Sequence, residues 1–346
     1  MVTLGGDCHK RSHTLVAVDD QGSQIGTRQV AATSVGHLEA IAWARQWPDR
    51  RWALENCRPL SRLLERDLLR AGEVVVQVSP KLMGLSRRSA REPGKSDPID
   101  ALAAARAAIR EPHLPVAQLE GRARELKLLV DHREDLVGER TRIQNRLRWH
   151  LHELEPGFEI CPGGLVRKVV LAEVRRLLKR HEGVVAELAF DLATRLVELT
   201  RAVDELERRI ARLVAVLAPS LLRLPGCGPL SAAKFVAETA DVRRFHSSAA
   251  FAMHNGTAPI PVWSGNRERH RLNRGGNRQL NAALHRVAIT QIRLGGEASV
   301  YVARKRSLGS TKAEAIRALR RQLSDEVYRR LRVDSAEGSG RESAAA

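Results

Sequence analysis

The sequence predicts a mixed α/β domain at its N-terminal end, followed by a long region that is almost entirely helical. Short β-type runs alternate with helical runs as far as about Val78, strand signals disappear after Arg122, and a heptad pattern extends from Leu192 to Leu217. Segregation of strands and helices along a chain is typical of separate domains. With 346 residues and 43% hydrophobic content, the chain is long enough for two or three domains.

The N-terminal elements follow the order of a ribonuclease-H-like sheet. The predicted strands are TLGGDC, HTLVAVD, QIGTRQVAA, RRWALEN and EVVVQV, with helices over residues 35–47 and 60–71 between the later strands. In a ribonuclease-H-like sheet, three antiparallel strands come first and are followed by alternating helices and strands, as predicted here. Residues 79–96, which include the basic run KLMGLSRRSAREPGK, are predicted to form a loop. A helix is expected to start at Asp97–Pro98, because proline is favoured in the first turn.

The helical region contains a strong coiled-coil signal. Apolar residues alternate spacings of four and three at Leu192, Leu196, Leu199, Val203, Leu206, Ile210, Leu213 and Leu217, which we call the heptad seam. An earlier stretch from Leu126 to Leu154 repeats the spacing, but Arg133, Arg140 and His150 interrupt it. The two stretches could form an antiparallel hairpin across the turn-rich PGFEICPGG, a dimer zipper, or both. The low-complexity end, DSAEGSGRESAAA, is predicted to be disordered.

The charge balance points to a polyanionic partner. Lys and Arg total 58 against 40 Asp and Glu, which gives a net charge of +18, and nucleic acid is the leading candidate. A merely basic or ribosome-associated protein is the alternative. The four cysteines show no CxxC pairing, and no apolar run of membrane-spanning length or signal peptide occurs. We therefore expect neither a zinc site nor a disulfide framework, and a protein of a reducing cytoplasm with no membrane partner.

Four carboxylates are candidate metal ligands. Asp7 ends the first predicted strand and Glu55 ends the fourth, so both project from one sheet. Asp97 and Asp100 lie three residues apart at a helix start and share a helical face. Hard oxygen donors of this kind suit Mg²⁺ or Mn²⁺. Each acid also has a plain structural interpretation. Asp97 suits the N-cap of a helix and Asp100 its first turn, while Asp7 suits a turn at a strand end and Glu55 suits a solvent-exposed surface.

Two C-terminal segments are candidates for phosphate contact. LPGCGPLSAAKFVAE resembles a helix-hairpin-helix in which the amides near Gly226 and Gly228 face a phosphate, although a Gly-Pro turn between helices explains the same residues. Further along, Ser264 precedes Gly265 in a predicted loop. Five arginines follow it at Arg267, Arg269, Arg271, Arg274 and Arg278. Arginines this dense in a loop indicate phosphate binding.

The segments GGDCHK, ALENC and GKSDPIDALAAARAA resemble the DEDD, RuvC-like transposases of bacterial insertion sequences, the group that includes the pilin-gene invertase. The resemblance implies that Asp7, Glu55, Asp97 and Asp100 bind metal. Residues 224–293 are similar to the transposase domain that follows in those enzymes, whose SG serine is the nucleophile, which implies this role for Ser264. MHNGTAPIP departs from the family pattern, whereas SG and GGNRQLN are present.

The resemblance further implies that the protein is a serine recombinase that cleaves and rejoins donor and target DNA. It also implies that a guide (bridge) RNA pairs with both DNAs, that the protein is a homodimer, and that two dimers form the active assembly. The expected domains are a RuvC-like domain at 1–115, a helical coiled-coil connector at 116–218, an all-α transposase domain at 219–332 and a disordered tail at 333–346. One alternative is a metal-dependent, junction-resolvase-like nuclease that uses water. Another is an architectural DNA-binding protein without catalysis.

Overall fold

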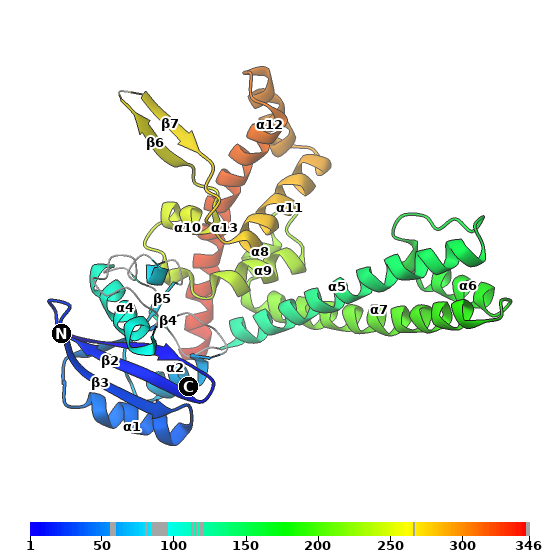
Figure 1. Ribbon diagram of the computed structural model, residues 1–346. Helices are drawn as coiled ribbons and strands as arrows, with labels where there is room; N and C mark the ends of the chain where they lie inside the picture. Colours follow the sequence, from blue (N-terminus) through cyan, green and yellow to red (C-terminus); the bar gives the residue numbers. More distant parts are fainter. Residues whose placement is uncertain are drawn as a thin grey trace. The chain divides into compact units, whose positions relative to one another are not determined.

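The computed structural model describes residues 1–55, 60–79, 82–84, 96–111, 114, 116–117, 121–265 and 267–343. Most of the predicted basic loop, Cys57 and the last three residues lie outside these ranges. The chain divides into two compact units, Met1–Glu120 and Gly121–Ala346, which we describe separately (Figure 1). The second unit contains the predicted connector from residue 121 onward together with the predicted C-terminal domain.

The first unit is built on a five-stranded mixed sheet. Its elements are β1 (Val2–Cys8), β2 (Ser12–Val18), β3 (Gln24–Ala31), α1 (Ser34–Ala44), β4 (Arg50–Glu55), α2 (Arg62–Arg70), β5 (Val75–Val78) and α4 (Asp97–Arg110). The strand order is β3-β2-β1-β4-β5, in which β1–β2 and β2–β3 are antiparallel and β1–β4 and β4–β5 are parallel. The predicted ribonuclease-H-like, RuvC-like order is confirmed.

Two apolar layers sandwich this sheet, as strand alternation requires. On one face, Leu4, Leu15 and Trp52 pack with buried residues of α1 and α2. On the other face, Val16, Ala53 and their neighbours pack against the alanine-rich side of α4. Helix α4 therefore covers the same face of the sheet to which alternate residues of β1 and β4 point.

Gly5 allows α4 to lie unusually close to the central strand. A Cβ atom at Gly5 would be 1.9 Å from the carbonyl oxygen of Ala101 and 2.8 Å from the amide nitrogen of Ala105. Both atoms belong to the helix backbone, so no side-chain movement would relieve the overlap. The absence of a side chain at this position thus sets the distance between α4 and β1.

The second unit is largely helical. Its elements are α5 (Arg122–Leu154), α6 (Lys168–Leu178), α7 (Val184–Leu217), α8 (Pro219–Leu222), α9 (Pro229–Thr239), α10 (Ser248–Asn255), β6 (Ile260–Ser264), β7 (Arg267–Arg271), α11 (Arg278–Leu294), α12 (Glu297–Ser307) and α13 (Lys312–Ser343). Helices α5 and α7 lie side by side over most of their length (Figure 1). Among the helices that the structure describes, none combines the length and apolar character needed to cross a membrane.

The heptad seam packs within the chain rather than being left open. Leu196, Leu199, Val203 and Ile210 are each no more than 2% exposed. The α5–α7 pair is reinforced by the Arg133 Nη2–Glu207 Oε1 ion pair at 2.5 Å. The antiparallel hairpin is thus the alternative that the structure adopts, and one of the arginines that interrupts the α5 pattern binds an acid on α7.

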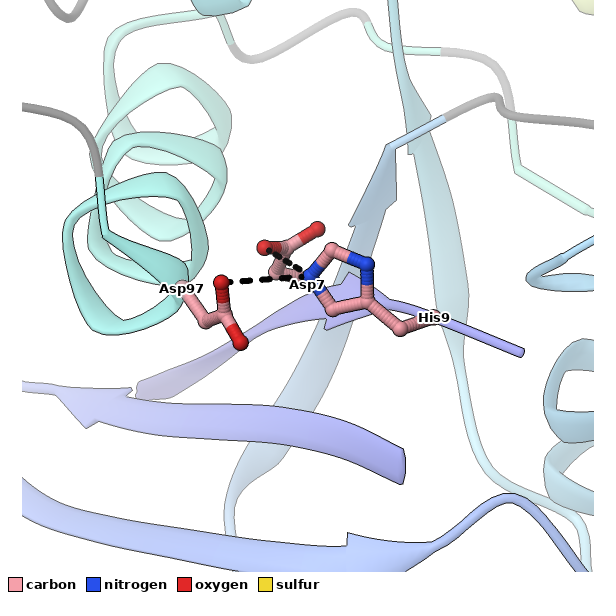
Figure 2. A group of neighbouring side chains, drawn as sticks. All are labelled: Asp7, His9 and Asp97. Carbon is pink, nitrogen blue, oxygen red and sulfur yellow. Dashed lines mark hydrogen bonds and ion pairs between the residues drawn. The ribbon is translucent and has the colours of Figure 1, made fainter. Parts of the chain in front are cut away.

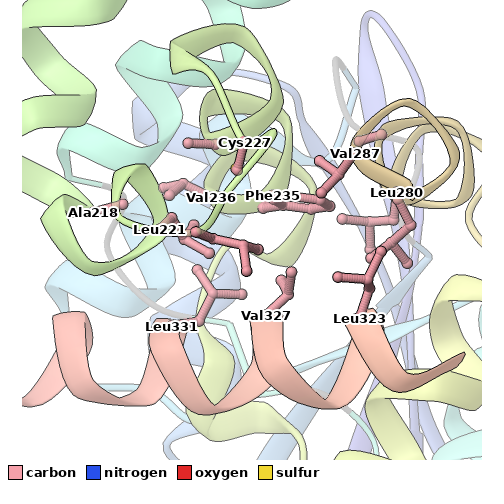
Figure 3. Close-up of a cluster of buried hydrophobic side chains, with 14 of the residues drawn as sticks. Ala218, Leu221, Cys227, Phe235, Val236, Leu280, Val287, Leu323, Val327 and Leu331 are labelled. Carbon is pink, nitrogen blue, oxygen red and sulfur yellow. The ribbon is translucent and has the colours of Figure 1, made fainter. Parts of the chain in front are cut away.

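Helices α8, α9, α11 and α13 share one core, in which side chains from distant parts of the chain meet (Figure 3). Phe235 of α9 is fully buried there, together with Leu280 of α11 and Val327 of α13. Burying large apolar side chains of this kind stabilises the fold by roughly 1.5–3 kcal/mol each. This core fixes the helices from which the β6–β7 hairpin emerges.

The prediction that everything after Arg122 is helical was wrong at one place. Strands β6 and β7 form an antiparallel two-stranded sheet, where the sequence analysis expected a loop in an all-α domain. Strand β7 reads RERHR, which has no apolar alternation because all five of its residues are exposed. A strand without a buried face leaves no period-two signal in the sequence.

The tail also differs from its prediction, because α13 continues through Ser343. Asp334 is only 6% exposed, and its Oδ1 accepts a hydrogen bond from the backbone N–H of Ser220 at 2.9 Å. The buried Leu331 lies one turn earlier. Helix propagation is favourable once packing fixes the preceding turns, so this anchored end carries the helix into a segment of low-complexity composition.

Candidate active site

The two strand-borne acids lie on adjacent parallel strands. The register pairs Gly6 of β1 with Leu54 of β4, so Asp7 and Glu55 are the next residues on each strand. Residues at equivalent positions of paired parallel strands point to the same face, about 4.8 Å apart. This is the face that α4 covers, since Gly5 and Ala53 contact α4.

The two helix-borne acids occupy the first turn of α4. Ser96 is the N-cap residue and Asp97 is the first helical residue, so Asp97 does not serve as the cap. The Asp97 side chain is 49% exposed, whereas Asp100 is only 8% exposed. Negative charge is favoured near a helix N-terminus. The close approach at Gly5 brings this turn over the end of β1.

His9 joins Asp7 and Asp97, a contact that the sequence analysis missed. His9 Nε2 is 3.0 Å from Asp7 Oδ2 and 3.3 Å from Asp97 Oδ1 (Figure 2). One ligand atom from each of the three residues lies within 4.8 Å of the others. The available signal was the spacing of two from Asp7, which suits a shared side of an extended segment. The contact with Asp97 is tertiary and has no local signature.

The electrostatics of this cluster favour a cation. Burial is the largest influence on the Asp7 carboxyl, and it raises its pKa; His9 opposes this rise, and the negative charges of Asp100 and Asp97 add to it. Asp97 and Asp100 are therefore close enough to Asp7 for their negative charges to repel its carboxylate. Oxygen donors crowded in this way fit a divalent cation, which would offset the repulsion. Glu55 joins this face through the strand register.

Ser264 lies at the end of the β6–β7 hairpin, where it pairs with Arg267 across the strands. Gly265 follows with φ of +57°, a left-handed conformation that glycine adopts readily. Cross-strand partners share a face, so Ser264 shares one with Arg267, Arg269 and Arg271, and Trp263 points to the other. Arg274 and Arg278 are also exposed, beyond β7 and at the start of α11.

The base of this hairpin is held by close backbone contact. A Cβ at Gly276 would lie 2.3 Å from the backbone nitrogen of Gly256, so the chain segments entering and leaving the hairpin touch. The N–H of Asn277 donates to His254 O at 2.7 Å, and Asn273 Nδ2 donates to Met253 O at 3.0 Å. The root of the hairpin is thereby fixed to α10.

Asn277 also ties the hairpin to the helical core. Its Oδ1 caps α11 by accepting from the N–H groups of Gln279 and Leu280, at 2.9 and 3.0 Å. Its Nδ2 donates to Glu238 Oε2 at 2.7 Å, and Lys127 Nζ donates to Glu238 Oε1 at 2.6 Å. This chain of contacts connects α5, α9 and α11, so the GGNRQLN element positions the segment that follows β7.

The Gly-Pro element precedes α9. Gly226 has φ of +76°, and a Cβ there would be 3.2 Å from Thr290 and Gln291 side-chain atoms of α11. Gly228 is the N-cap residue of α9, which makes no side-chain capping hydrogen bond. Gly226 therefore serves a tight turn packed on a neighbouring helix, as one of the two interpretations expected. Phosphate contact by these amides stays a prediction.

Comparisons with known proteins match two transposase family models to different parts of the chain. Residues 4–156 match the family model of DEDD transposases of the IS110 type, and residues 218–303 match the model described as transposase IS116/IS110/IS902 family.

Full-length relatives and a solved structure were also found. The chain is 27% identical to the "Insertion element IS116 uncharacterized 44.8 kDa protein" of Streptomyces clavuligerus, over 96% of this chain and 94% of the relative. It is 26% identical to the "Mini-circle putative transposase for IS117" of Streptomyces coelicolor, over 94% of this chain and 93% of that relative. The structure of T. thermophilus RuvC in complex with Holliday junction substrate aligns with 15% sequence identity and a TM-score of 0.27, and the alignment covers 34% of this chain and 99% of RuvC. The RuvC-like fold of the first unit is assigned from its strand order and not from this alignment.

Proposed function

This chain belongs to the IS110/IS116 family of transposases, enzymes that cleave and transfer DNA strands, and from this premise we propose a division of labour between its two units. Asp7, Glu55, Asp97 and Asp100 bind Mg²⁺ or Mn²⁺, and Ser264 is the nucleophile that attacks a DNA phosphodiester. The arginines around Ser264 bind the phosphates on either side of the attacked bond.

The observation that carries the metal half of this proposal is the convergence of acids on the α4 face of the sheet. Asp7 and Asp97 meet around His9, and Asp100 contributes to the raised pKa of Asp7. An alternative in which these residues serve only as helix caps and turn formers does not account for three acids that lie close together, two of them, Asp7 and Asp100, buried. When bound, the metal would supply Lewis-acid stabilisation to phosphoryl transfer.

The serine half is supported by the placement of Ser264 on the hairpin. The side chain is exposed, shares its face with Arg267, Arg269 and Arg271, and lies on a segment whose base is fixed to α10 and α11. Guanidinium groups bind phosphate oxygens through paired N–H donors. The hairpin thus presents a hydroxyl within a field of positive charge that attracts a DNA strand.

In the proposed reaction, Ser264 Oγ forms a bond to phosphorus while the bond from phosphorus to one deoxyribose oxygen breaks. The proton that the hydroxyl loses is balanced by the proton that the released sugar hydroxyl gains. The phosphoserine link retains the energy of the phosphodiester, so reversal with another DNA end rejoins strands without an external energy source. Arg267 stabilises the charge on the non-bridging oxygens.

We further propose that the active enzyme is assembled from more than one chain. The acids of one subunit act with Ser264 of another, in a homodimer or an assembly of two dimers. Because the heptad seam is used within the chain, the surface that joins subunits would include other faces of α5 and α7. A bridge RNA that pairs with donor and target DNA completes the proposal, and the net charge of +18 is compatible with binding both polyanions.

The test is cleavage of donor DNA by full-length protein with Mg²⁺ and candidate flanking RNA, followed by denaturing gels that retain covalent protein–DNA adducts. We expect wild-type protein to form the adduct, and Ser264→Ala to bind DNA but form neither adduct nor product. Ser307→Ala, which changes an exposed serine at the end of α12, is the matched control. Continued cleavage by Ser264→Ala would overturn the serine mechanism and favour a resolvase-like nuclease that uses water.

A further inference from the structure

We propose that His9 is itself a ligand of the cation held by Asp7 and Asp97, and that this imidazole makes the site favour Mn²⁺ over Mg²⁺ more than an all-carboxylate site would. The inference deepens the metal half of the proposed function and rests on it. It adds a nitrogen ligand to the carboxylate set.

The first argument is the number of protons available at His9. One ring nitrogen, Nε2, faces two carboxylate oxygens, Asp7 Oδ2 at 3.0 Å and Asp97 Oδ1 at 3.3 Å. Nε2 carries at most one hydrogen, so a single straight hydrogen bond can serve only one of the two acids. The hydrogen bond is with Asp7, and Asp97 Oδ1 is left at the longer distance of 3.3 Å. A cation between the three atoms would satisfy both carboxylates and the nitrogen together.

The second argument is the spacing of these atoms. For metal–ligand bonds of roughly 2.1 Å in octahedral geometry, neighbouring ligand atoms lie about 3 Å apart. The two measured distances, 3.0 and 3.3 Å, have this size. The third pair closes the triangle, because all three ligand atoms lie within 4.8 Å of one another. The three atoms are therefore near enough to one another to become ligands of one cation.

The third argument is that the chain holds each member in place. Asp7 belongs to β1 and pairs with Thr14 of β2. The backbone N–H of His9 donates to Ser12 O at 3.0 Å, which fixes the turn between β1 and β2. Asp97 is held by the first turn of α4, whose distance from β1 is set by Gly5. His9 itself lies one residue beyond β1, in the short β1–β2 turn that this hydrogen bond holds, so its imidazole stays close to the end of the strand.

The choice of metal follows from ligand chemistry. Mg²⁺ is a hard cation that strongly prefers oxygen ligands and keeps much of its water. Mn²⁺ also prefers carboxylate oxygen, but as a larger transition-metal ion that gives up its water more easily it accepts an imidazole nitrogen more readily than Mg²⁺ does. Replacing His9 by a side chain without a ring nitrogen should therefore weaken Mn²⁺ binding more than Mg²⁺ binding.

The experiment uses full-length protein and Mn²⁺ alone as the probe, without DNA. Free Mn²⁺ is counted by electron paramagnetic resonance during a titration, and pulsed measurements on the bound ion detect a directly coordinated ¹⁴N nucleus. We expect nitrogen coupling in wild-type protein and its loss in His9→Gln. The Kd for Mn²⁺ should rise by about tenfold or more, the scale on which even outer-shell partners act. The Kd for Mg²⁺, measured by competition, should change less.

Two further variants separate the possible failures. His152→Gln removes an exposed histidine of α5 and should leave both the nitrogen coupling and the Kd unchanged. Asp7→Asn should abolish Mn²⁺ binding. Binding that depends on Asp7 but shows no nitrogen coupling, or that is unaltered in His9→Gln, overturns the role of His9 and leaves the carboxylate site standing. Failure of the wild-type protein to bind Mn²⁺, or binding indifferent to Asp7, overturns the metal half of the proposed function as well.

Discussion

At the scale of residues, the candidate site brings together side chains that would separate in the absence of the fold. Asp7 and Asp97 are placed by a strand end and a helix start, and both acids were predictable because each stands at a recognisable boundary. His9 was not predictable, because its importance comes from a contact with Asp97 that only the packing of α4 on the sheet creates. Ser264 became a candidate only through the family resemblance, since its local sequence is a common one.

A pair of histidines, His13 and His37, on the face of the sheet away from α4 affects the stability of the fold. His13 is 1% exposed, and its Nε2 is 3.2 Å from Nε2 of His37, whose Nδ1 is 2.7 Å from Asp67 Oδ2. Burial is the main cause that lowers the pKa of His13 from 6.5 to about 4, and the charge of His37 adds to it. The folded state therefore resists protonation here.

This shift predicts acid sensitivity. Between pH 6.5 and about 4, unfolded chains bind a proton at His13 that folded chains do not, so the free energy of unfolding falls as pH falls through this window. The contribution is at most about 1.4 kcal/mol per pH unit. We expect His13→Gln to show a shallower decline than wild-type protein in urea unfolding at pH 6.5, 5.5 and 4.5, with chelator present. Equal slopes for the two proteins would show that His13 does not couple to unfolding.

At the scale of elements, most of the first unit was predictable, because β1, β2 and β4 are short, largely buried runs and α1, α2 and α4 each bury one helical face. The β6–β7 hairpin was not, because β7 has no buried residue. The sequence also left open which helix packs on the heptad seam, since the same apolar spacing suits a helix of the same chain or of another. Chain connectivity and ion pairs such as Arg133–Glu207 favour packing of the seam against α5.

The position of α4 depends on Gly5, which provides a matched pair of substitutions. In Gly5→Ala the new Cβ meets the helix backbone at 1.9 Å, whereas in Gly6→Ala it meets the Leu54 side chain at 2.6 Å on the opposite face. Both substitutions should destabilise the unit, each by roughly 1–3 kcal/mol as for overpacked cores. Only Gly5→Ala should also move Asp97 and Asp100 away from Asp7.

We therefore expect Gly5→Ala to lower Mn²⁺ affinity by at least about tenfold, the effect of losing part of a ligand set, under conditions where circular dichroism shows both variants folded. Gly6→Ala should bind Mn²⁺ as wild-type protein does. Unchanged affinity in Gly5→Ala would mean that the acids do not depend on the close approach of α4.

At the scale of the whole molecule, the net charge of +18 and the exposed arginines of the β6–β7 hairpin imply that nucleic-acid affinity is largely electrostatic. If about six phosphates are neutralised, log affinity should fall against log salt concentration with a slope near −5. Replacing Arg269 and Arg271 together with Ala should make the slope shallower by about two. Fluorescence anisotropy with donor DNA between 50 and 300 mM salt measures this, and a slope near zero would exclude a phosphate-dominated interface.

The central claim is that the acids of the first unit and Ser264 of the second act on the same phosphodiester, each from a different subunit. The most direct measurement is adduct formation by a co-expressed pair of variants, a size-tagged Asp7→Asn chain together with an untagged Ser264→Ala chain. Each variant alone should be inactive. The pair should form a covalent DNA adduct only on the tagged chain, which retains the serine. The absence of any adduct from the mixed assembly, or an adduct formed at the wild-type rate by Asp7→Asn alone, would contradict the account.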